Sequence, residues 1–125
     1  MQKMKKLPDA EFEIMKVVWA HEPPVTTNII MQKLGNEKEW LIQTVVSLMT
    51  RLIGRGFLRS EKHGKERTYY PIVERDDYLK FETGNFIKQY HENSFTNLVN
   101  TLNEDKALTE KDIDELYEWL KERKG

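Results

Sequence analysis

The segment WLIQTVVSLMTRLIGRGFL, residues 40–58, constrains the fold more than any other part of the chain. Its apolar residues recur at helical spacing, so that one side of the predicted helix must be buried. Gly56 is expected to close this helix. The residues of the predicted buried face are Val45, Leu48, Met49, Leu52 and Ile53.

The hydrophobic period changes directly after this helix. The sequence FLRSEKHGKERTYYPIV predicts two short strands, residues 57–62 and 66–72. Between them lie His63, Gly64 and Lys65, which are typical of a turn. We therefore expect a charged β-hairpin immediately behind the helix.

Two further helices are predicted upstream. The first begins at Asp9, whose carboxylate can cap the open N–H groups, and the prolines at 23 and 24 follow its end. A short second helix begins at Thr26 or Thr27 and stops at Gly35. Helices followed by a charged hairpin are the outline of a winged helix-turn-helix, in which the last helix enters the DNA major groove and the hairpin contacts the backbone. We assign residues 1–73 to such a DNA-binding domain.

Residues 74–125 are predicted to be helical again. One helix covers about 76–90, a second is capped by Ser94, and a third begins at Thr109 with a capping box in which Asp112 replaces the usual Glu. About fifty residues with so many apolar faces are too few to close a monomeric core, so we expect a helical dimerisation domain. Folding back onto residues 1–73 is the alternative. The predicted dimerisation residues are Tyr78, Phe81, Phe86, Phe95, Leu98, Val99, Leu102, Ile113, Leu116, Tyr117 and Leu120.

The fold class expected from these elements is mostly α with a small β-hairpin. It consists of an N-terminal winged helix-turn-helix and a C-terminal helical dimerisation domain.

The polar residues of the 40–58 helix form a stripe opposite its apolar face. Gln43, Ser47, Thr50 and Gly54 follow helical spacing, and the segment from Trp40 to Ser60 contains no acidic residue. A helix between two phosphate backbones must avoid negative charge and offer short amide, hydroxyl and guanidinium donors to base edges. The alternative is an ordinary amphipathic helix with a small polar face.

The hairpin adds basic residues, which suit contacts with phosphates on either side of a groove. Glu61 and Glu66 favour the alternative of a solvated turn. Arg59 flanks the hairpin entry together with Arg55, whereas Tyr69 and Tyr70 are expected to serve packing. The predicted DNA-binding residues are Gln43, Thr44, Ser47, Thr50, Arg51, Arg55, Lys62, Lys65 and Arg67.

Charge and composition limit the other classes of function. Residues 1–73 carry a net charge of +4 and residues 74–125 a net charge of −5, so a polyanion is expected to meet only the first half. The chain has no cysteine, and its 3 histidines are too dispersed for a metal site, so neither metal nor cofactor is expected. No Ser, His and acid grouping indicates an enzyme. Without an apolar run of about 20 residues or a secretory leader, a cytoplasmic protein without membrane insertion is expected.

Several blocks together resemble the penicillinase-repressor family, the BlaI and MecI type of bacterial transcription repressor. They are LPDAEFEIMKVVW, NIIMQKL, the QTV, SLM and RL residues of the third helix with RGFL, GKERTYYPIV and LTEKDIDELYEWL. The resemblance extends from Leu7 to about Leu120. It implies a homodimer that holds two recognition helices over a palindromic operator and represses β-lactamase or related resistance genes. By position, Thr44, Ser47 and Arg51 would face the groove.

The resemblance also implies induction through a sensor protease system that ends in cleavage of the dimer domain. The family's scissile bond tends to join Asn to Phe in the middle C-terminal helix, and its nearest equivalent here joins Asn100 to Thr101. The chain also has Leu41 and Gln43 where the family usually has Ser and Lys, which implies a different operator.

Two other hypotheses remain open. One is a winged-helix regulator that binds a small ligand between its halves, near Phe81, Phe86, Tyr90 and Trp119. The other is a winged-helix protein-interaction module that does not bind DNA.

Overall fold

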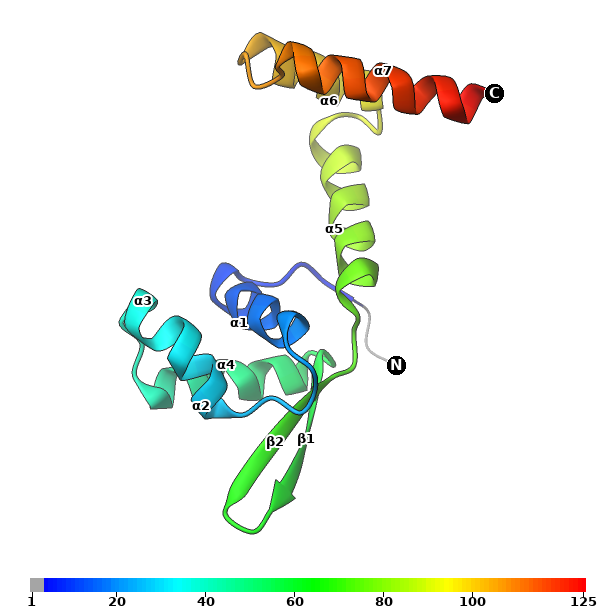
Figure 1. The fold of residues 1–125 in the computed structure, drawn as a ribbon. Helices are drawn as coiled ribbons and strands as arrows, with labels where there is room; N and C mark the ends of the chain where they lie inside the picture. The colour runs from blue at the N-terminus through cyan, green and yellow to red at the C-terminus, as the bar shows by residue number, and fades with distance from the viewer. Residues whose placement is uncertain (1–3) are drawn as a thin grey trace. The chain divides into compact units, whose positions relative to one another are not determined.

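The computed structural model describes residues 4–125, which belong to two compact units, one ending at Glu82 and the other formed by Thr83–Gly125. Seven α-helices, a π-helical turn and a two-stranded antiparallel sheet make up the described residues, which confirms the expected fold class (Figure 1). The elements are α1 (Asp9–Ala20), α2 (Thr27–Ile30), η1 (Met31–Gly35), α3 (Asn36–Lys38), α4 (Ile42–Gly54), β1 (Leu58–His63), β2 (Glu66–Pro71), α5 (Arg75–Tyr90), α6 (Phe95–Glu104) and α7 (Glu110–Lys124).

The core of the first unit joins α1 to α4. Ile14, Met15 and Val18 of α1 are fully buried, as are the α4 residues Val45, Met49 and Leu52. Burying each aliphatic side chain of this size contributes about 1.5–3 kcal/mol to folding. The apolar stripe of α4 is therefore fixed toward the interior, and its polar stripe toward solvent.

Helix α1 begins at Asp9 as predicted, but its predicted cap is wrong, as is the predicted end of the second helix. The α1 N-cap is Pro8 instead of Asp9, and no side chain caps this helix, because Asp9 already lies in its first turn. The second helix is capped by Thr26 as predicted, but it continues past Gly35 to Lys38. Gly35 has the helical angles φ −57° and ψ −48°, and the left-handed residue that ends the run is Glu39.

The third helix also differs from its prediction at one position. Ile53 was expected to be buried, but 36% of its surface is exposed, because it lies at the edge of the apolar stripe near the end of α4. Gly56, with φ +82°, then turns the chain into the hairpin. Tyr69 exchanges backbone hydrogen bonds of 2.8 and 2.9 Å with Val25, which attaches the hairpin base to the segment before α2.

An aromatic cluster attaches the start of α5 to the core. The Tyr78 ring contacts the rings of Phe12, Trp19, Phe57 and Phe81 at centroid distances of 5.5–6.3 Å. Its hydroxyl accepts a buried 2.8 Å hydrogen bond from the backbone N–H of Leu7.

The prediction that Tyr78 faces a partner subunit is wrong, because only 3% of its surface is exposed. Phe81 is partly buried against the same core. The first compact unit therefore extends to Glu82, beyond the expected boundary at 73/74.

The second unit has two well-capped helices and almost no interior. The Ser94 hydroxyl caps α6, and Thr109 and Asp112 form the predicted capping box at the start of α7. Within residues 83–125, His91 is the single buried residue. The apolar side chains of this unit are therefore left partly or largely in solvent.

Candidate nucleic-acid interface

The polar stripe of α4 lies on the solvent side of the first unit. Gln43, Thr44, Ser47, Thr50 and Arg51 are all exposed. Four of them, with Leu48, line a shallow hollow of about 280 Å³ on the helix surface. The structure thus brings together the predicted groove residues of α4 on a face that is free of acidic groups.

The N-terminus of α4 carries an unneutralised positive partial charge. Its N-cap is Leu41, which provides no side-chain hydrogen bond, and the first turn contains no acidic residue. The open N–H groups and the helix dipole at such an end favour a negatively charged neighbour. The first turn of α4 is therefore electrostatically compatible with a phosphate backbone.

Thr50 uses its hydroxyl hydrogen within the helix. Its Oγ1 donates a 2.9 Å hydrogen bond to the backbone carbonyl of Val46, one turn earlier. Thr50 can therefore offer a base its oxygen lone pairs and its methyl group, but not a free donor.

Arg55 lies at the end of α4 and has an intramolecular partner. Its Nε donates to Oε1 of Glu11 at 2.5 Å, and Nη2 lies 3.5 Å from Oε2. Glu11 is 1% exposed, so this pair neutralises a buried carboxylate on α1. Arg55 was predicted to bind DNA, but in the folded chain its guanidinium is directed to Glu11. Neither the residue type nor its spacing indicated this contact, since the partners are 44 positions apart.

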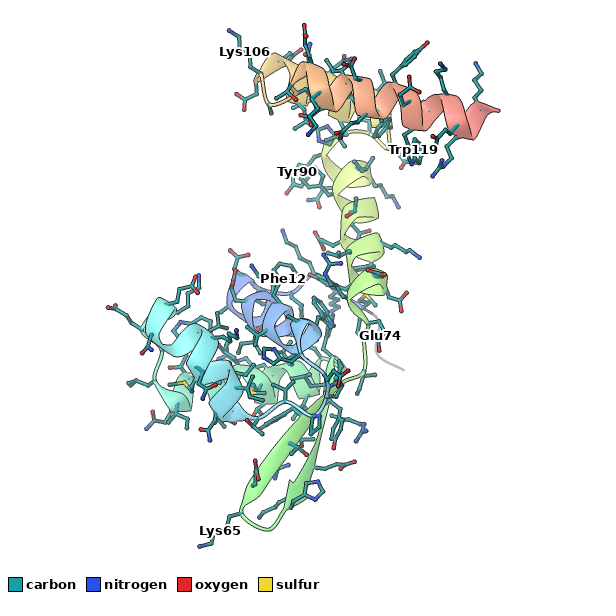
Figure 2. The ribbon with its side chains drawn as sticks, in the orientation of Figure 1. Phe12, Lys65, Glu74, Tyr90, Lys106 and Trp119 are labelled. Carbon is teal, nitrogen blue, oxygen red and sulfur yellow. The ribbon has the colours of Figure 1, made fainter. Side chains whose placement is uncertain are left out.

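The hairpin formed by β1 and β2, here called the wing, presents basic residues near its tip. Lys62 pairs in register with Arg67, and both are exposed. Lys65 occupies the two-residue turn with Gly64, and its side chain extends away from the tip (Figure 2). Arg67 donates a 2.8 Å hydrogen bond to the Ser60 hydroxyl, which orients its guanidinium.

One arginine of the wing is already neutralised. Arg59 donates a 2.7 Å hydrogen bond to Glu61 and lies 4.1 Å from the centroid of the Tyr70 ring. The hydrogen bond from Arg59 holds the pKa of the Glu61 carboxyl below its ordinary value of 4.5. Among the described residues of the wing, Lys62, Lys65 and Arg67 are the Lys and Arg side chains that form no ion pair with a carboxylate, although Glu66 adjoins Lys65 and Arg67 in the sequence.

The structure adds apolar residues that sequence reasoning had not assigned to this face. Leu41, Ile42 and Val46 are 69%, 48% and 41% exposed and lie beside the polar stripe. Their positions on the helical wheel, off the buried stripe, were the signal that could have identified them.

The predicted dimerisation residues of the second unit are largely exposed within the single chain. Phe95 and Tyr117 are 55% and 61% exposed, and Phe86, Leu102, Ile113 and Leu120 range from 37% to 49%. Leu98, Val99 and Leu116 are half-buried. Asn100 and Thr101, the predicted cleavage pair, are exposed residues inside α6.

Residues 4–125 show no cluster of three or more potential metal-ligating His, Asp or Glu side chains. Over the same residues, every helix is too short or too polar to cross a lipid bilayer.

A short helix pair, a following helix with an exposed acid-free face and a wing with a basic tip define a winged helix-turn-helix protein. The sequence model of the penicillinase repressor family matches residues 7–122. The chain belongs to this family of transcriptional repressors.

Relatives cover nearly the full chain. The penicillinase repressor of Bacillus licheniformis is 31% identical over 125 residues, covering 100% of this chain and 97% of the relative. The methicillin resistance regulatory protein MecI of Staphylococcus aureus (strain N315) is 32% identical over 122 residues, covering 97% and 98%.

Two solved structures resemble part of the chain. The solution structure of the DNA-binding domain of the repressor BlaI has a TM-score of 0.54 and 35% identity. The monomeric form of Bacillus licheniformis BlaI in complex with the blaP half-operator has a TM-score of 0.52 and 35% identity. Each match covers 62% of this chain and 94% of the other.

Proposed function

We propose that this protein is a homodimeric transcriptional repressor that binds a palindromic operator and controls β-lactamase or related resistance genes. The observation that carries the proposal is the exposed, acid-free face of α4, together with a wing whose tip is basic in the same compact unit. The relative solved with a half-operator supports the same use of this fold.

In the proposed complex, α4 lies in the major groove. Gln43, Thr44, Ser47 and Arg51 contact base edges, since their side chains are short or donor-rich and free of negative charge. Lys62, Lys65 and Arg67 of the wing bind phosphates. Arg55 supports this surface from behind through its ion pair with Glu11.

The second unit supplies the dimer contacts. Its helices expose large apolar side chains and bury almost none, which indicates that a second copy completes the core. Burial of Tyr78 and the position of Phe81 shift the proposed boundary between DNA-binding and dimerisation parts from 73/74 toward 82/83.

Regulation follows the family pattern in this proposal. Cleavage between Asn100 and Thr101 would interrupt α6 and separate the dimer contacts, so that each half-site loses its partner. The bond is helical in the folded chain, so cleavage requires local unfolding of α6. The protein acts without a catalytic activity of its own and works in the cytoplasm, where its operator is found.

The test is selection of a random duplex DNA library by the purified full-length protein at about physiological salt, followed by sequencing. We expect enrichment of an inverted repeat whose half-sites are about one or more helical turns apart. A bound pool without any motif would contradict sequence-specific repression and favour a protein-interaction module.

A further inference from the structure

Among residues 4–82, the first unit exposes few large apolar side chains, and most of them lie on one helix. The five that are at least 36% exposed are Leu41, Ile42, Val46, Ile53 and Ile72. Four of these belong to α4 or to its N-cap. Such a concentration on an otherwise charged domain marks a surface that becomes covered when the protein acts.

Ile42 and Val46 form a continuous ridge with Thr50. These residues follow a spacing of four, so their side chains lie one above another along α4. Since the Thr50 hydroxyl hydrogen is bound to the Val46 carbonyl, Thr50 adds its methyl group to the ridge. The ridge runs next to Gln43 and Ser47, the middle of the polar stripe.

This continuity determines what covers the ridge. Whatever contacts Gln43 and Ser47 also contacts Ile42 and Val46, and the proposed occupant of that face is the major groove of DNA. The apolar group that DNA presents there is the C5-methyl of thymine. We propose that Ile42 and Val46 determine operator specificity by packing against thymine methyl groups, beside the polar contacts of Gln43 and Ser47.

This inference rests on the proposed DNA-binding function and deepens it. It predicts thymines at one or two fixed positions of each half-site, at bases that α4 reaches with its first two turns. N-terminal residues of a recognition helix are those that contact base edges. Ile53, on the same side but two turns later, should therefore lie outside the base contacts.

The experiment changes only the methyl group. Each thymine of the selected operator is replaced in turn by deoxyuridine, which keeps the same hydrogen-bonding groups, and the Kd of the full-length protein is measured. We expect about a three- to fivefold loss at the contacted positions, the value of one buried methyl group. In Val46→Ala or Ile42→Ala, deoxyuridine at one of these positions should leave the Kd almost unchanged, because the side chain that contacts the methyl group is gone. In Ile53→Ala, deoxyuridine should raise the Kd as much as in the wild type.

The outcomes separate the two proposals. Tight operator binding that is insensitive to deoxyuridine at every position, or equally sensitive in wild type and in both alanine variants, would overturn the methyl contact and leave the repressor function intact. Absence of any preferred DNA sequence would overturn both. Because the substitutions lie at exposed positions, thermal melting should show that the variants fold like the wild type.

Discussion

Arg55 at the end of α4 and Glu11 on α1 form an ion pair across the first unit, with Nε and Oε1 2.5 Å apart. The carboxylate is 2% exposed at its side chain, whereas the guanidinium is 38% exposed. If the ion pair is broken, water can therefore solvate the Arg55 guanidinium but not the Glu11 carboxylate.

This difference predicts unequal effects of mutation. Arg55→Ala leaves a buried carboxylate unpaired and should lower the free energy of unfolding by about 3 kcal/mol. Glu11→Gln should cost about 1 kcal/mol, because the freed guanidinium reaches water and can still bind the amide oxygen. Urea unfolding measures both. Lys16→Ala, which removes the surface pair with Glu13, is the control and should cost less than 1 kcal/mol. Equal losses for Arg55→Ala and Lys16→Ala would show that the buried pair does not stabilise the fold.

A second prediction concerns the Tyr78 hydroxyl. Tyr78→Phe keeps the ring cluster but leaves the buried N–H of Leu7 without its acceptor, and should cost about 1–3 kcal/mol at neutral pH. Burial raises the pKa of Tyr78 above its ordinary value of 10.0. Above pH 10, Tyr78 ionises in the unfolded chain before it ionises in the folded one, which lowers the free energy of unfolding of the wild type. Tyr78→Phe has no hydroxyl at this position and does not undergo this decrease. The difference between the two proteins should narrow as pH rises above 10, as measured by urea unfolding from pH 8 to 11. A constant difference over this range would argue against a buried hydroxyl.

Truncation tests the extent of the first unit. A chain ending at Glu82 keeps Tyr78 and Phe81 and should be a folded monomer. A chain ending at Val73 loses both rings and should melt at a lower temperature, because the aromatic cluster around Phe12 and Trp19 is opened. Circular dichroism gives the melting temperatures, and sedimentation gives the mass. A dimeric 1–82 chain would refute the assignment of dimer contacts to the second unit.

The wing predicts how salt affects DNA binding. Lys65→Gln should weaken binding to all sequences and reduce the slope of log K against log salt by about 1, since one phosphate contact is lost. Arg59→Gln is the matched control. This substitution should change the slope less, because the Arg59 charge is already neutralised by Glu61.

Arg51→Ala on α4 should instead weaken binding to the operator alone, by about 1–3 kcal/mol. Titrations at several salt concentrations with operator and unrelated DNA distinguish these effects, and equal slopes for Lys65→Gln and wild type would remove the wing from the interface.

The exposed apolar face of α7 predicts a charge-sensitive dimer. Ile113→Glu or Leu120→Glu places a carboxylate in the proposed interface and should yield monomers in sedimentation experiments. Glu118→Lys alters the charge on the opposite side of the same helix and should leave the dimer intact. If all three variants remain dimeric, the interface lies elsewhere in residues 83–125.

The sequence predicted helix starts well where a hydrogen bond within a single helical turn defines them. Thr26, Ser94 and Thr109 cap the predicted helices because each hydroxyl needs only an N–H two or three residues away. Gly35 misled the prediction, since a glycine permits a left-handed residue without requiring one, and here the buried Gly35 has helical angles.

The sequence by itself determined the winged helix-turn-helix outline, the acid-free stripe of α4 and the basic tip of the wing, because these depend on periodicity and charge along short segments. The tertiary structure alone decided that Tyr78 belongs to the first core and that Arg55 is bound to Glu11. Those facts depend on which surfaces meet across 44 or 71 positions of chain. Long-range contacts are a property of the packed whole, so neither a tyrosine nor an arginine reveals its partners before the helices come together.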